Sequence, residues 1–558
     1  MVGKVLPPPP LRSSLFPSVP PFINYVPQFR KEKLSSNVGQ ALLEYGPQYW
    51  DHWNWDQDQF WRIPNAMGNL VRDLDVLLEM MEDKGFKSSN SSKNTGNRHS
   101  KIINTEYFQS PFVQRSGDRV DFFDSHPGVK IRPFPDLHEL SNKISLGQLF
   151  CEAQQKFNPS EFDFHPITLS DFPKDWKYLK DELINNPNQF WIYKPAKRNN
   201  GSGVTLIDDF SFLELGMKKK NRNEDFVIQK YIHKPLLIDG YKFDIRIYVV
   251  LTSLDPLCIY IYNDGLVRIA TELYSENPEL ISETRMHVTN YAINKTSSNY
   301  VHENDGLSCK GNKWRLIALW GYLSNVYGLT KDDFDEIWNK IHDIVIKTVL
   351  LGYKNFLKEF KDNTKSSAYN SYKILGLDIL IDGDMNIHLI EVNSRPALLD
   401  DEIDKQVNRP MMDELVRIVG FHIPAGSVSP MRKSLIQHTL QNEEISSYNP
   451  NIYCRIDSSI KKKIEFENKT ERKKYLNNIL ENISSCDLRV LIKMEEERSQ
   501  LCKFERVFPT PDTYKYFEYM EGVPYYDKLV DAYELKYGND RESGLNFIRS
   551  LCHRRIHI

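Results

Sequence analysis

The sequence predicts an α/β or α+β fold in which short strands and helices share the central part of the chain. Residues 188–270 contain short apolar runs broken by Asn, Gly, Asp and Pro, a pattern typical of β-strands. Apolar residues then recur at helical spacing over 311–327 and 331–360. Two more strand-like runs, LGLDILI and NIHLIEVN, flank an Asp-Gly-Asp turn at 382–384. This mixed order excludes a helix bundle.

Length and composition limit the class of protein further. The chain has 558 residues, more than the roughly 250–300 at which one hydrophobic core stops growing, so we expect several packed units. With 40% hydrophobic and 26% charged residues, it falls outside the disordered, collagen-like and disulfide-rich classes. The net charge of −3 argues against a field that binds nucleic acid or membrane over the whole surface. We therefore expect electrostatic recognition to be local.

The cysteines and the N-terminus indicate the compartment. None of the seven cysteines is spaced as CxxC or CxxxxC, so neither a zinc ribbon nor a disulfide framework is predicted. The N-terminus lacks the apolar core of a signal peptide, and no run of about 18 apolar residues occurs. We expect a soluble intracellular protein in a reducing compartment.

The two ends of the chain differ from its centre. Residues 1–40 are rich in proline, with PPPP at 7–10, and predict an arm or linker. A helical pattern covers 69–85, whereas the polar stretch 87–101 predicts a mobile loop. The C-terminal part is charged and predicted to be mostly helical. Its window 461–474 has seven bases and three acids, which indicates either a solvated helix face or a basic docking surface.

The hairpin at 377–393 carries the residues that point most directly to chemistry. If its loop has an even number of residues, Asp378 shares a sheet face with Glu391 and Asn393. A four-residue loop would place Asp378 opposite Leu389. Two carboxylates and an amide suit Mg²⁺ when phosphates and water complete its octahedron, although both carboxylates could instead simply face solvent. The other face of the hairpin is expected to pack into a core and carries Ile379, Ile381, Ile390 and Val392.

Two segments earlier in the chain predict a phosphate-binding wall. Lys194 is in a strand that leads into a loop with Gly201 and Gly203, where backbone N–H groups and one cation could surround a phosphate. The loop matches neither GxxxxGK[ST] nor GxGxxG, and a plain hairpin turn is the alternative. A later strand ends in four residues whose backbone groups could face a purine edge: Gln229, Lys230, Tyr231 and Ile232.

A charged strand follows this wall. Lys242, Asp244 and Arg246 alternate with apolar residues and therefore face the same way. They would suit a site beside phosphates and carboxylates, and a surface salt-bridge ladder is the alternative. Arg268, in the next strand, adds a planar fork suited to a carboxylate. Because no Ser or Cys nucleophile motif and no HExxH spacing occurs, the residues describe a polyanion site rather than a hydrolase or zinc site.

Eight ordered motifs resemble the tubulin tyrosine ligase-like family: WIYKP, GSG, VIQKYIHKPLLI, YKFDIRIYVVLTS, DGLVRIATELY, MHVTNYAINK, LGLDILID and LIEVNSRP. They extend over about 188–422, the ATP-grasp catalytic core of that family. The flanking motifs SLFPSVPP, GNKWRLIALWGYL, FERVFPTPDTYKYFEYMEG and GLNFIRSLCHRRIHI resemble its glutamate-adding branch, especially the chain-initiating members. The domains expected are a proline-rich arm (1–40), an N-terminal domain (41–140), a central ATP-grasp domain (141–231), a C-terminal ATP-grasp domain with the metal site (232–422) and a helical, partly basic extension (423–558).

The resemblance implies an ATP-dependent ligase. ATP would phosphorylate a glutamate side chain in an acidic tubulin tail, and the amine of free glutamate would attack the acyl phosphate to form a branch. The residues implied to bind ATP are Lys143, Lys194, Gly201, Gly203, Gln229, Lys230, Tyr231 and Ile232. Those implied to hold Mg²⁺, expected as two ions, are Asp378, Glu391 and Asn393. Arg246 would stabilise the transferring phosphoryl group, and the residues implied to orient the amino acid and acyl phosphate are Lys242, Asp244, Arg268, Thr289 and Asn290.

The same resemblance implies partners and location. We expect a monomer that binds tubulin or microtubules, other proteins with acidic tails, and free glutamate, but neither nucleic acid nor membrane. The expected location is the cytoplasm, at microtubules and at a cilium or basal body. A glycine ligase and an inactive microtubule-binding adaptor are the alternatives. One departure is Arg395, where the family more commonly has a small or apolar residue.

Overall fold

The computed structural model describes residues 11–12, 14–16, 19, 22–23, 62–64, 87–89, 137–172, 174–198, 201–207, 225–363, 372–398, 401–420, 460–476 and 478–557. The predicted helix over 69–85 lies outside these residues. Within them the chain forms mixed helices and antiparallel sheets, which confirms the predicted fold class.

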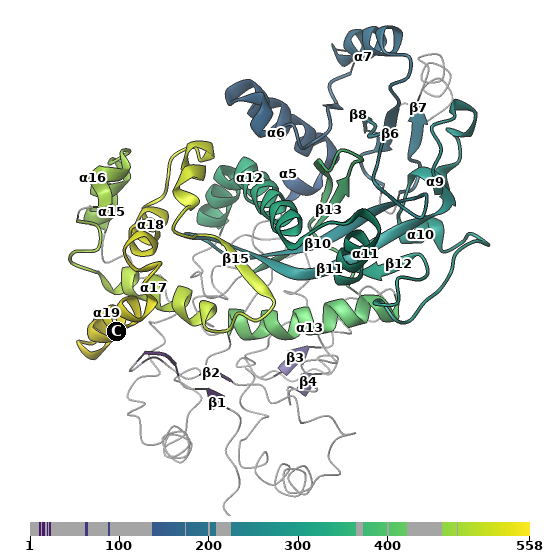
Figure 1. Ribbon diagram of the computed structural model, residues 1–558. Coiled ribbons are helices and arrows are strands. Elements are labelled where there is room, and N and C mark those ends of the chain that lie inside the picture. The colour runs from purple at the N-terminus through teal and green to yellow at the C-terminus, as the bar shows by residue number, and fades with distance from the viewer. Residues whose placement is uncertain are drawn as a thin grey trace, which may run out of the picture.

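A central sheet organises the molecule (Figure 1). Its strands, in spatial order, are β12 (Lys313–Arg315), β11 (Leu257–Leu273), β10 (Tyr241–Leu254), β13 (Lys373–Ile381) and β14 (Ile387–Asn393). Two short strands extend it, because β15 (Phe504–Phe508) pairs with β11 and β9 (Leu237–Ile238) pairs with β10. All of these pairings are antiparallel.

Each face of the central sheet is covered by a helix. Residues such as Ile245 of β10 and Ile341 of α12 (Lys331–Asn363) belong to one hydrophobic cluster. Tyr248 of β10 and Met411 of α13 (Glu402–Val419) belong to another. Because alternate residues of a strand point to opposite faces, the even-numbered residues of β10 face α13. Toward the start of β10 these even-numbered positions are Lys242, Asp244 and Arg246, so the charged segment begins where the apolar cover of α13 ends.

A smaller sheet lies before the central sheet in the chain. Its strands, in spatial order, are β5 (Thr168–Leu169), β8 (Phe226–Lys230), β6 (Trp191–Pro195) and β7 (Thr205–Ile207). The helix α7 (Lys174–Asn185) packs its Leu179 and Leu183 against Trp191 of this sheet. The other helices among the described residues of the central part are α5 (His138–Ser141), α6 (Lys143–Lys156), α9 (Thr284–His287), α10 (Tyr291–Asn294) and α11 (Leu316–Tyr327). Short 3₁₀ segments lie at Pro159–Glu161, Pro278–Leu280 and Thr513–Tyr519.

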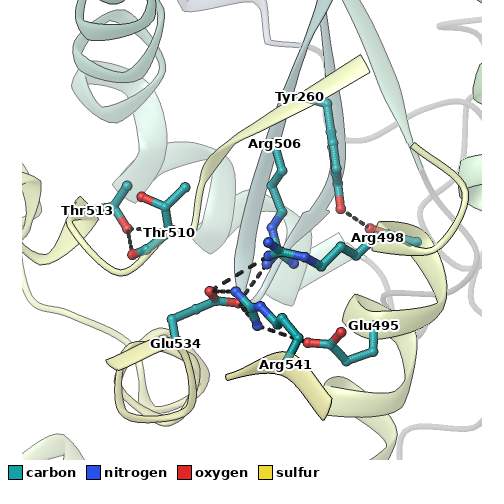
Figure 2. A network of polar contacts seen from close by, with 9 residues as sticks. Tyr260, Glu495, Arg498, Arg506, Thr510, Thr513, Glu534 and Arg541 are labelled. Atoms are coloured by element: carbon teal, nitrogen blue, oxygen red, sulfur yellow. Dashed lines mark hydrogen bonds and ion pairs between the residues drawn. The ribbon is translucent and has the colours of Figure 1, made fainter. Parts of the chain in front are cut away.

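Within the described residues 460–476 and 478–557, the C-terminal extension is mostly helical, as predicted, and it is joined to the central sheet. Its helices are α15 (Ile460–Glu467), α16 (Arg472–Leu476), α17 (Ser485–Arg498), α18 (Tyr525–Tyr537) and α19 (Arg541–His553). Figure 2 shows how Arg506, from β15, reaches Glu534 of α18, with Nη2 and Oε1 2.6 Å apart. Arg541 of α19 contacts the same carboxylate and also Glu495 of α17, at 3.1 Å. This buried network holds the helices against the strand that completes the sheet.

Four expectations about the flanks and connections differ from the structure. Within the predicted arm, the ring of Phe16 is buried among α17, α18 and α19, because residues distant in sequence supply an apolar pocket. The first residues of the predicted loop 87–101 form β4 (Lys87–Ser89), which pairs with β3 (Arg62–Pro64); β1 (Leu11–Arg12) pairs with β2 (Phe22–Ile23). The segment predicted as helical from 311 begins with β12 instead, since it pairs with β11.

The fourth difference concerns the basic window 461–474, whose charges are largely used inside the extension. Lys462 forms an ion pair with the buried Asp487 at 3.0 Å, and Arg472 forms one with Asp531 at 2.7 Å. Lys469 pairs with the exposed Glu465, and Lys474 pairs with the exposed Glu471. Of the seven bases, Lys462 and Arg472 therefore have a structural role, because their acidic partners are buried.

Cysteine state and helix character add two further observations. The six cysteines in the described ranges are free thiols. None of the helices that the structure describes combines the length and apolar composition that crossing a bilayer requires.

Candidate active site

A cavity of about 700 Å³ is lined by residues of both sheets and of the short helices beside them. Its wall contains ten Lys and Arg residues against four acidic residues, which favours a polyanionic ligand. The bases are Lys143, Lys194, Arg198, Lys230, Lys242, Arg246, Arg268, Lys295, Lys313 and Arg395, and the acids are Asp244, Asp378, Glu391 and Asp404. Of all the site residues predicted from the sequence, only Gly203 does not line this cavity.

The hairpin of β13 and β14 brings Asp378 and Glu391 directly opposite each other. The loop is neither of even length nor of four residues, the cases considered from the sequence, since Ile381 pairs with Ile387 and leaves five residues between them. An odd loop alone would turn Glu391 away, but the register shifts by one residue between Asp378 and its neighbour, which restores the shared face. Asn393 lies on that face opposite Gly376.

The same register shift corrects the predicted core face. Leu389 pairs with Ile379 and is fully buried in the core, where the sequence predicted that Leu389 would face the site. Ile390 was expected in the core and instead lines the cavity. The bulge therefore exchanges these two neighbouring side chains while Ile379, Ile381 and Val392 keep their predicted core positions.

Charges of opposite sign alternate across adjacent strands at the cavity wall. Arg246 pairs in register with Asp378 and donates to it from Nε, at 2.5 Å, and from Nη2, at 3.1 Å. Arg268 pairs in register with Asp244 and donates from Nε at 2.7 Å; its Nη2 also lies 2.8 Å from Oδ2 of Asp378. Asp378 is 2% exposed, so the two guanidinium groups hold a carboxylate that has almost no contact with solvent. The row fixes all four side chains with little freedom.

The pKa values of the two carboxylates of the hairpin shift in opposite directions. Although burial opposes ionisation of Asp378, the charges of Arg246 and Arg268 hold its pKa below the usual value. Burial, together with the neighbouring charge of Asp378, raises the pKa of Glu391. Asn393 donates from Nδ2 to Oε1 of Glu391 at 3.2 Å. The charges of Lys143 and Lys194 act on Glu391 in the opposite direction without cancelling this rise.

The side-chain oxygens of Asp378, Glu391 and Asn393 fit a divalent cation. Carboxylate and amide oxygens are the ligands that Mg²⁺ prefers, and a cation between Asp378 and Glu391 would relieve their repulsion. The described residues contain no group of three or more His, Cys, Asp and Glu side chains at metal-binding spacing. Two carboxylates and one amide would leave coordination positions for water and substrate phosphates.

Lysines and glycines form the end of the cavity near the smaller sheet. Lys194 donates to Oε1 of Gln229 at 2.6 Å, and burial, partly offset by Glu391, lowers its pKa to about 8. Lys143, the first residue of α6, donates to the carbonyl oxygen of Arg198 at 3.0 Å. Gly201 has a φ of +74°, and a Cβ there would lie 2.6 Å from Cδ1 of Ile293. The loop can therefore approach α10 only with glycine at this position.

Lys242 lies in a chain of polar contacts. Its ammonium donates to the hydroxyl of Tyr231 at 2.9 Å, and that hydroxyl lies 3.0 Å from Nδ1 of His287. Burial lowers the pKa of Lys242 to about 7 and that of His287 to about 4. Tyr231, predicted to support a purine, therefore contacts Lys242 with its hydroxyl. Thr289 and Asn290 follow His287 and line the cavity, as predicted.

Sequence reasoning missed Lys313, which extends the charged row by one strand. Lys313 pairs in register with Arg268 and forms ion pairs with Asp401 at 2.7 Å and Asp404 at 3.0 Å. Its ammonium also lies 4.2 Å from the centre of the Tyr291 ring. The alternation of Lys313 and Arg315 around an apolar Trp could have indicated a strand, but the segment was interpreted as the start of a helix.

The antiparallel central sheet, the smaller sheet and the cavity lined by both define the class as an ATP-grasp-like protein with a polyanion site. Residues 123–429 match the family described as the tubulin-tyrosine ligase family. Because this match spans more than half of the chain, the chain belongs to that family.

Similar proteins carry glutamylase names. Mouse (Mus musculus) tubulin monoglutamylase TTLL4 is 32% identical over 444 residues, covering 77% of this chain and 35% of that protein. Mouse tubulin polyglutamylase TTLL6 is 36% identical over 296 residues, covering 52% of this chain and 34% of that protein. Tubulin polyglutamylase ttll-4 of Caenorhabditis elegans is 27% identical over 472 residues, covering 82% of this chain and 72% of that protein. The chain thus spans about a third of the length of the two mouse relatives.

Proposed function

We propose that this chain is an ATP-dependent ligase that adds glutamate to the side-chain carboxylates of glutamates in acidic tubulin tails. The observation that carries the proposal is the row of alternating charges along one cavity, with Arg246, Asp378 and Glu391 on neighbouring strands. Such a row offers cations to phosphates and carboxylates to Mg²⁺ on the same wall. The glutamylase names of similar proteins support glutamate as the added amino acid.

Different residues of the cavity would bind the phosphates of ATP, its base and Mg²⁺. Lys143 and Lys194, beside the Gly201 loop, would bind the phosphates of ATP. The backbone of the segment 229–232 would face the base. Asp378, Glu391 and Asn393 would hold Mg²⁺, as two ions, and bound Mg²⁺ would neutralise and orient the phosphate oxygens. We also propose the domain boundaries predicted from the sequence, which are 1–40, 41–140, 141–231, 232–422 and 423–558.

Charged side chains would then guide the transfer. Attack of the acceptor carboxylate on the γ-phosphorus of ATP forms an acyl phosphate and releases ADP, and Arg246 lies on the wall where negative charge would develop. The glutamate amine, after losing a proton, attacks the carbonyl carbon; a C–N bond forms and inorganic phosphate leaves. Lys242 holds the proton on its Nζ weakly, with a pKa of about 7, so it could exchange a proton with the incoming ammonium. Asp244 and Arg268 would orient the amino acid.

The test compares amino acids and one substitution. Purified protein would be incubated with tubulin, Mg²⁺-ATP and labelled glutamate, glycine or tyrosine. We expect incorporation of glutamate, lowered about 100-fold or more by Glu391→Gln, since removing even a residue that supports a metal ligand commonly costs 10- to 100-fold. Glu279→Gln, a change at an exposed acid outside the cavity, is the control and should leave the rate unchanged.

Three results would contradict the proposal. Glycine incorporation without glutamate would favour a glycine ligase. Equal incorporation by the parent protein and Glu391→Gln would show that the carboxylate does not hold the metal, whereas no incorporation would favour an inactive microtubule-binding adaptor. We further propose that the protein acts as a monomer in the cytoplasm, at microtubules and at a cilium or basal body.

A further inference from the structure

Four of the ten cations of the cavity wall either form ion pairs with carboxylates or are buried. Arg246, Arg268 and Lys313 form ion pairs with carboxylates, and Lys242 is 6% exposed. A cation with such partners is largely neutralised before a substrate arrives. Cations without a carboxylate partner therefore attract an approaching anion more strongly than the paired ones do.

Two such cations are exposed: Lys295, which follows α10, and Arg395, which follows β14. Both line the cavity, and neither forms an ion pair with any residue that the structure describes. The ammonium of Lys295 lies 5.0 Å from the centre of the Tyr291 ring. The ion-paired side chains of the cavity wall are buried, whereas Lys295 and Arg395 are exposed to solvent. We therefore assign these two residues to the entrance of the cavity.

The exposed position of Lys295 and Arg395 favours one of two anionic substrates, free glutamate or the acidic acceptor segment, as their ligand. Free glutamate is small and must bring its amine to the reacting carbonyl, so its carboxylates would meet buried groups such as Arg268. An acceptor segment is a polymer that enters from solvent and carries further carboxylates on either side of the modified one. Those flanking carboxylates pass the mouth while the modified residue is inside.

We propose that Lys295 and Arg395 form an acceptor-docking subsite that binds carboxylates flanking the modified glutamate in an acidic peptide segment. This subsite rests on the proposed ligase function. Exposed ion pairs contribute modestly, and the attraction falls with ionic strength. The pair therefore selects acceptors with neighbouring acidic residues, and Arg395 makes that selection stronger than a small residue could.

The test separates the acceptor from the other substrates. Initial rates would be measured against tubulin concentration at saturating ATP and glutamate, and against glutamate at saturating tubulin. For Lys295→Gln and Arg395→Gln we expect the KM for tubulin to rise about two- to fivefold each, and about tenfold in the double variant at low salt. The KM for glutamate, the KM for ATP and kcat should stay within about twofold.

Three controls sharpen the result. Arg395→Lys should restore most of the affinity, because it restores the charge. Lys474→Gln removes an exposed base that lies outside the cavity and pairs with Glu471, and it should change nothing. The effect of the double variant should shrink between about 50 mM and 300 mM salt, as expected for exposed charges.

A binding measurement keeps the inference independent of turnover. A labelled acidic tail peptide should bind the double variant about tenfold more weakly than the parent protein in fluorescence anisotropy. An unchanged KM for tubulin and unchanged peptide binding would overturn the docking subsite while leaving glutamate incorporation intact. A rise in the KM for glutamate instead would assign the two cations to the donor and also overturn it. Absence of glutamate incorporation by the parent protein would refute the ligase function itself.

Discussion

At the scale of single residues, Lys242 carries an ammonium group in a setting that favours the neutral amine. Burial lowers its pKa from 10.5 to about 7, although Asp244 opposes the shift. Between these two pH values the unfolded chain holds a proton that the folded chain releases. The free energy of unfolding should therefore rise with pH over this interval, by up to about 1.4 kcal/mol per pH unit from this one group.

The variant Lys242→Met should lack this contribution. Below about pH 7 both states of the parent protein are protonated, so the burial penalty is constant there and the difference between parent and variant stays flat. From about pH 7 upward the parent should gain stability relative to the variant. Urea unfolding at intervals from pH 6 to pH 9.5 measures the difference, with Lys234→Met, a change at an exposed lysine, as control. A difference that is independent of pH would contradict the shifted pKa.

At the scale of elements, the hairpin shows what a local pattern can and cannot predict. Alternation predicted that Asp378, Glu391 and Asn393 share a face, and the strands bring them there. The even loop length on which this prediction was conditioned does not occur, and the positions of Leu389 and Ile390 were predicted wrongly. The bulge has no signal in the local sequence, so it could not be predicted. The argument from alternation therefore assigned the correct face only because two errors cancelled: the loop has an odd length, and the bulge shifts the register by one residue.

The helices α15 and α16 provide a prediction about the basic window 461–474. Lys462 donates to three carbonyl oxygens, including that of Ile479 at 3.0 Å, and pairs with Asp487, whose side chain has no exposed surface. Lys462→Gln would leave Asp487 buried with less compensation and should destabilise the extension by about 3 kcal/mol. Hydrogen exchange of the α17 amides would report this loss.

An exposed base of the same window is the matched control. Lys473→Gln should change exchange by no more than about 0.5 kcal/mol, because Lys473 is exposed. If Lys462→Gln instead weakened tubulin binding while exchange stayed unchanged, the window would be a docking surface and its structural role would be refuted.

At the scale of the whole molecule, three consecutive buried glutamates of α17, Glu495–Glu497, each contact a different part of the chain. The first pairs with Arg541 of α19 at 3.1 Å. The second accepts from the backbone N–H of Leu15 at 2.6 Å, and the third accepts from the hydroxyl of Tyr260, in the central sheet, at 2.8 Å. The N-terminal segment, the C-terminal helices and the central sheet therefore meet on one turn of helix.

This meeting point lay beyond what the sequence could predict. Composition indicated a proline-rich arm and a charged helical extension as separate pieces. The contact of Leu15 with Glu496 joins positions 481 residues apart, and no local pattern carries such a distance. Acidic side chains in a helix also predict a solvated face, yet these are 2–3% exposed because partners from other elements compensate their burial.

Phe16 tests whether the N-terminal segment is a structural part of the extension. Its ring is 3% exposed and belongs to the same hydrophobic cluster as Leu491 and Ile548. Phe16→Ala should remove about 3 kcal/mol from the local stability of α17 and α19, because a large buried ring is lost and only part of the cavity can collapse. Leu535→Ala, at a half-exposed residue of α18, is the matched control. Hydrogen exchange of both helices measures the change, and a peptide of residues 11–23 added to a chain that lacks them should restore protection only when it carries the phenylalanine. Equal protection with and without the peptide would mean that the C-terminal helices hold together unaided.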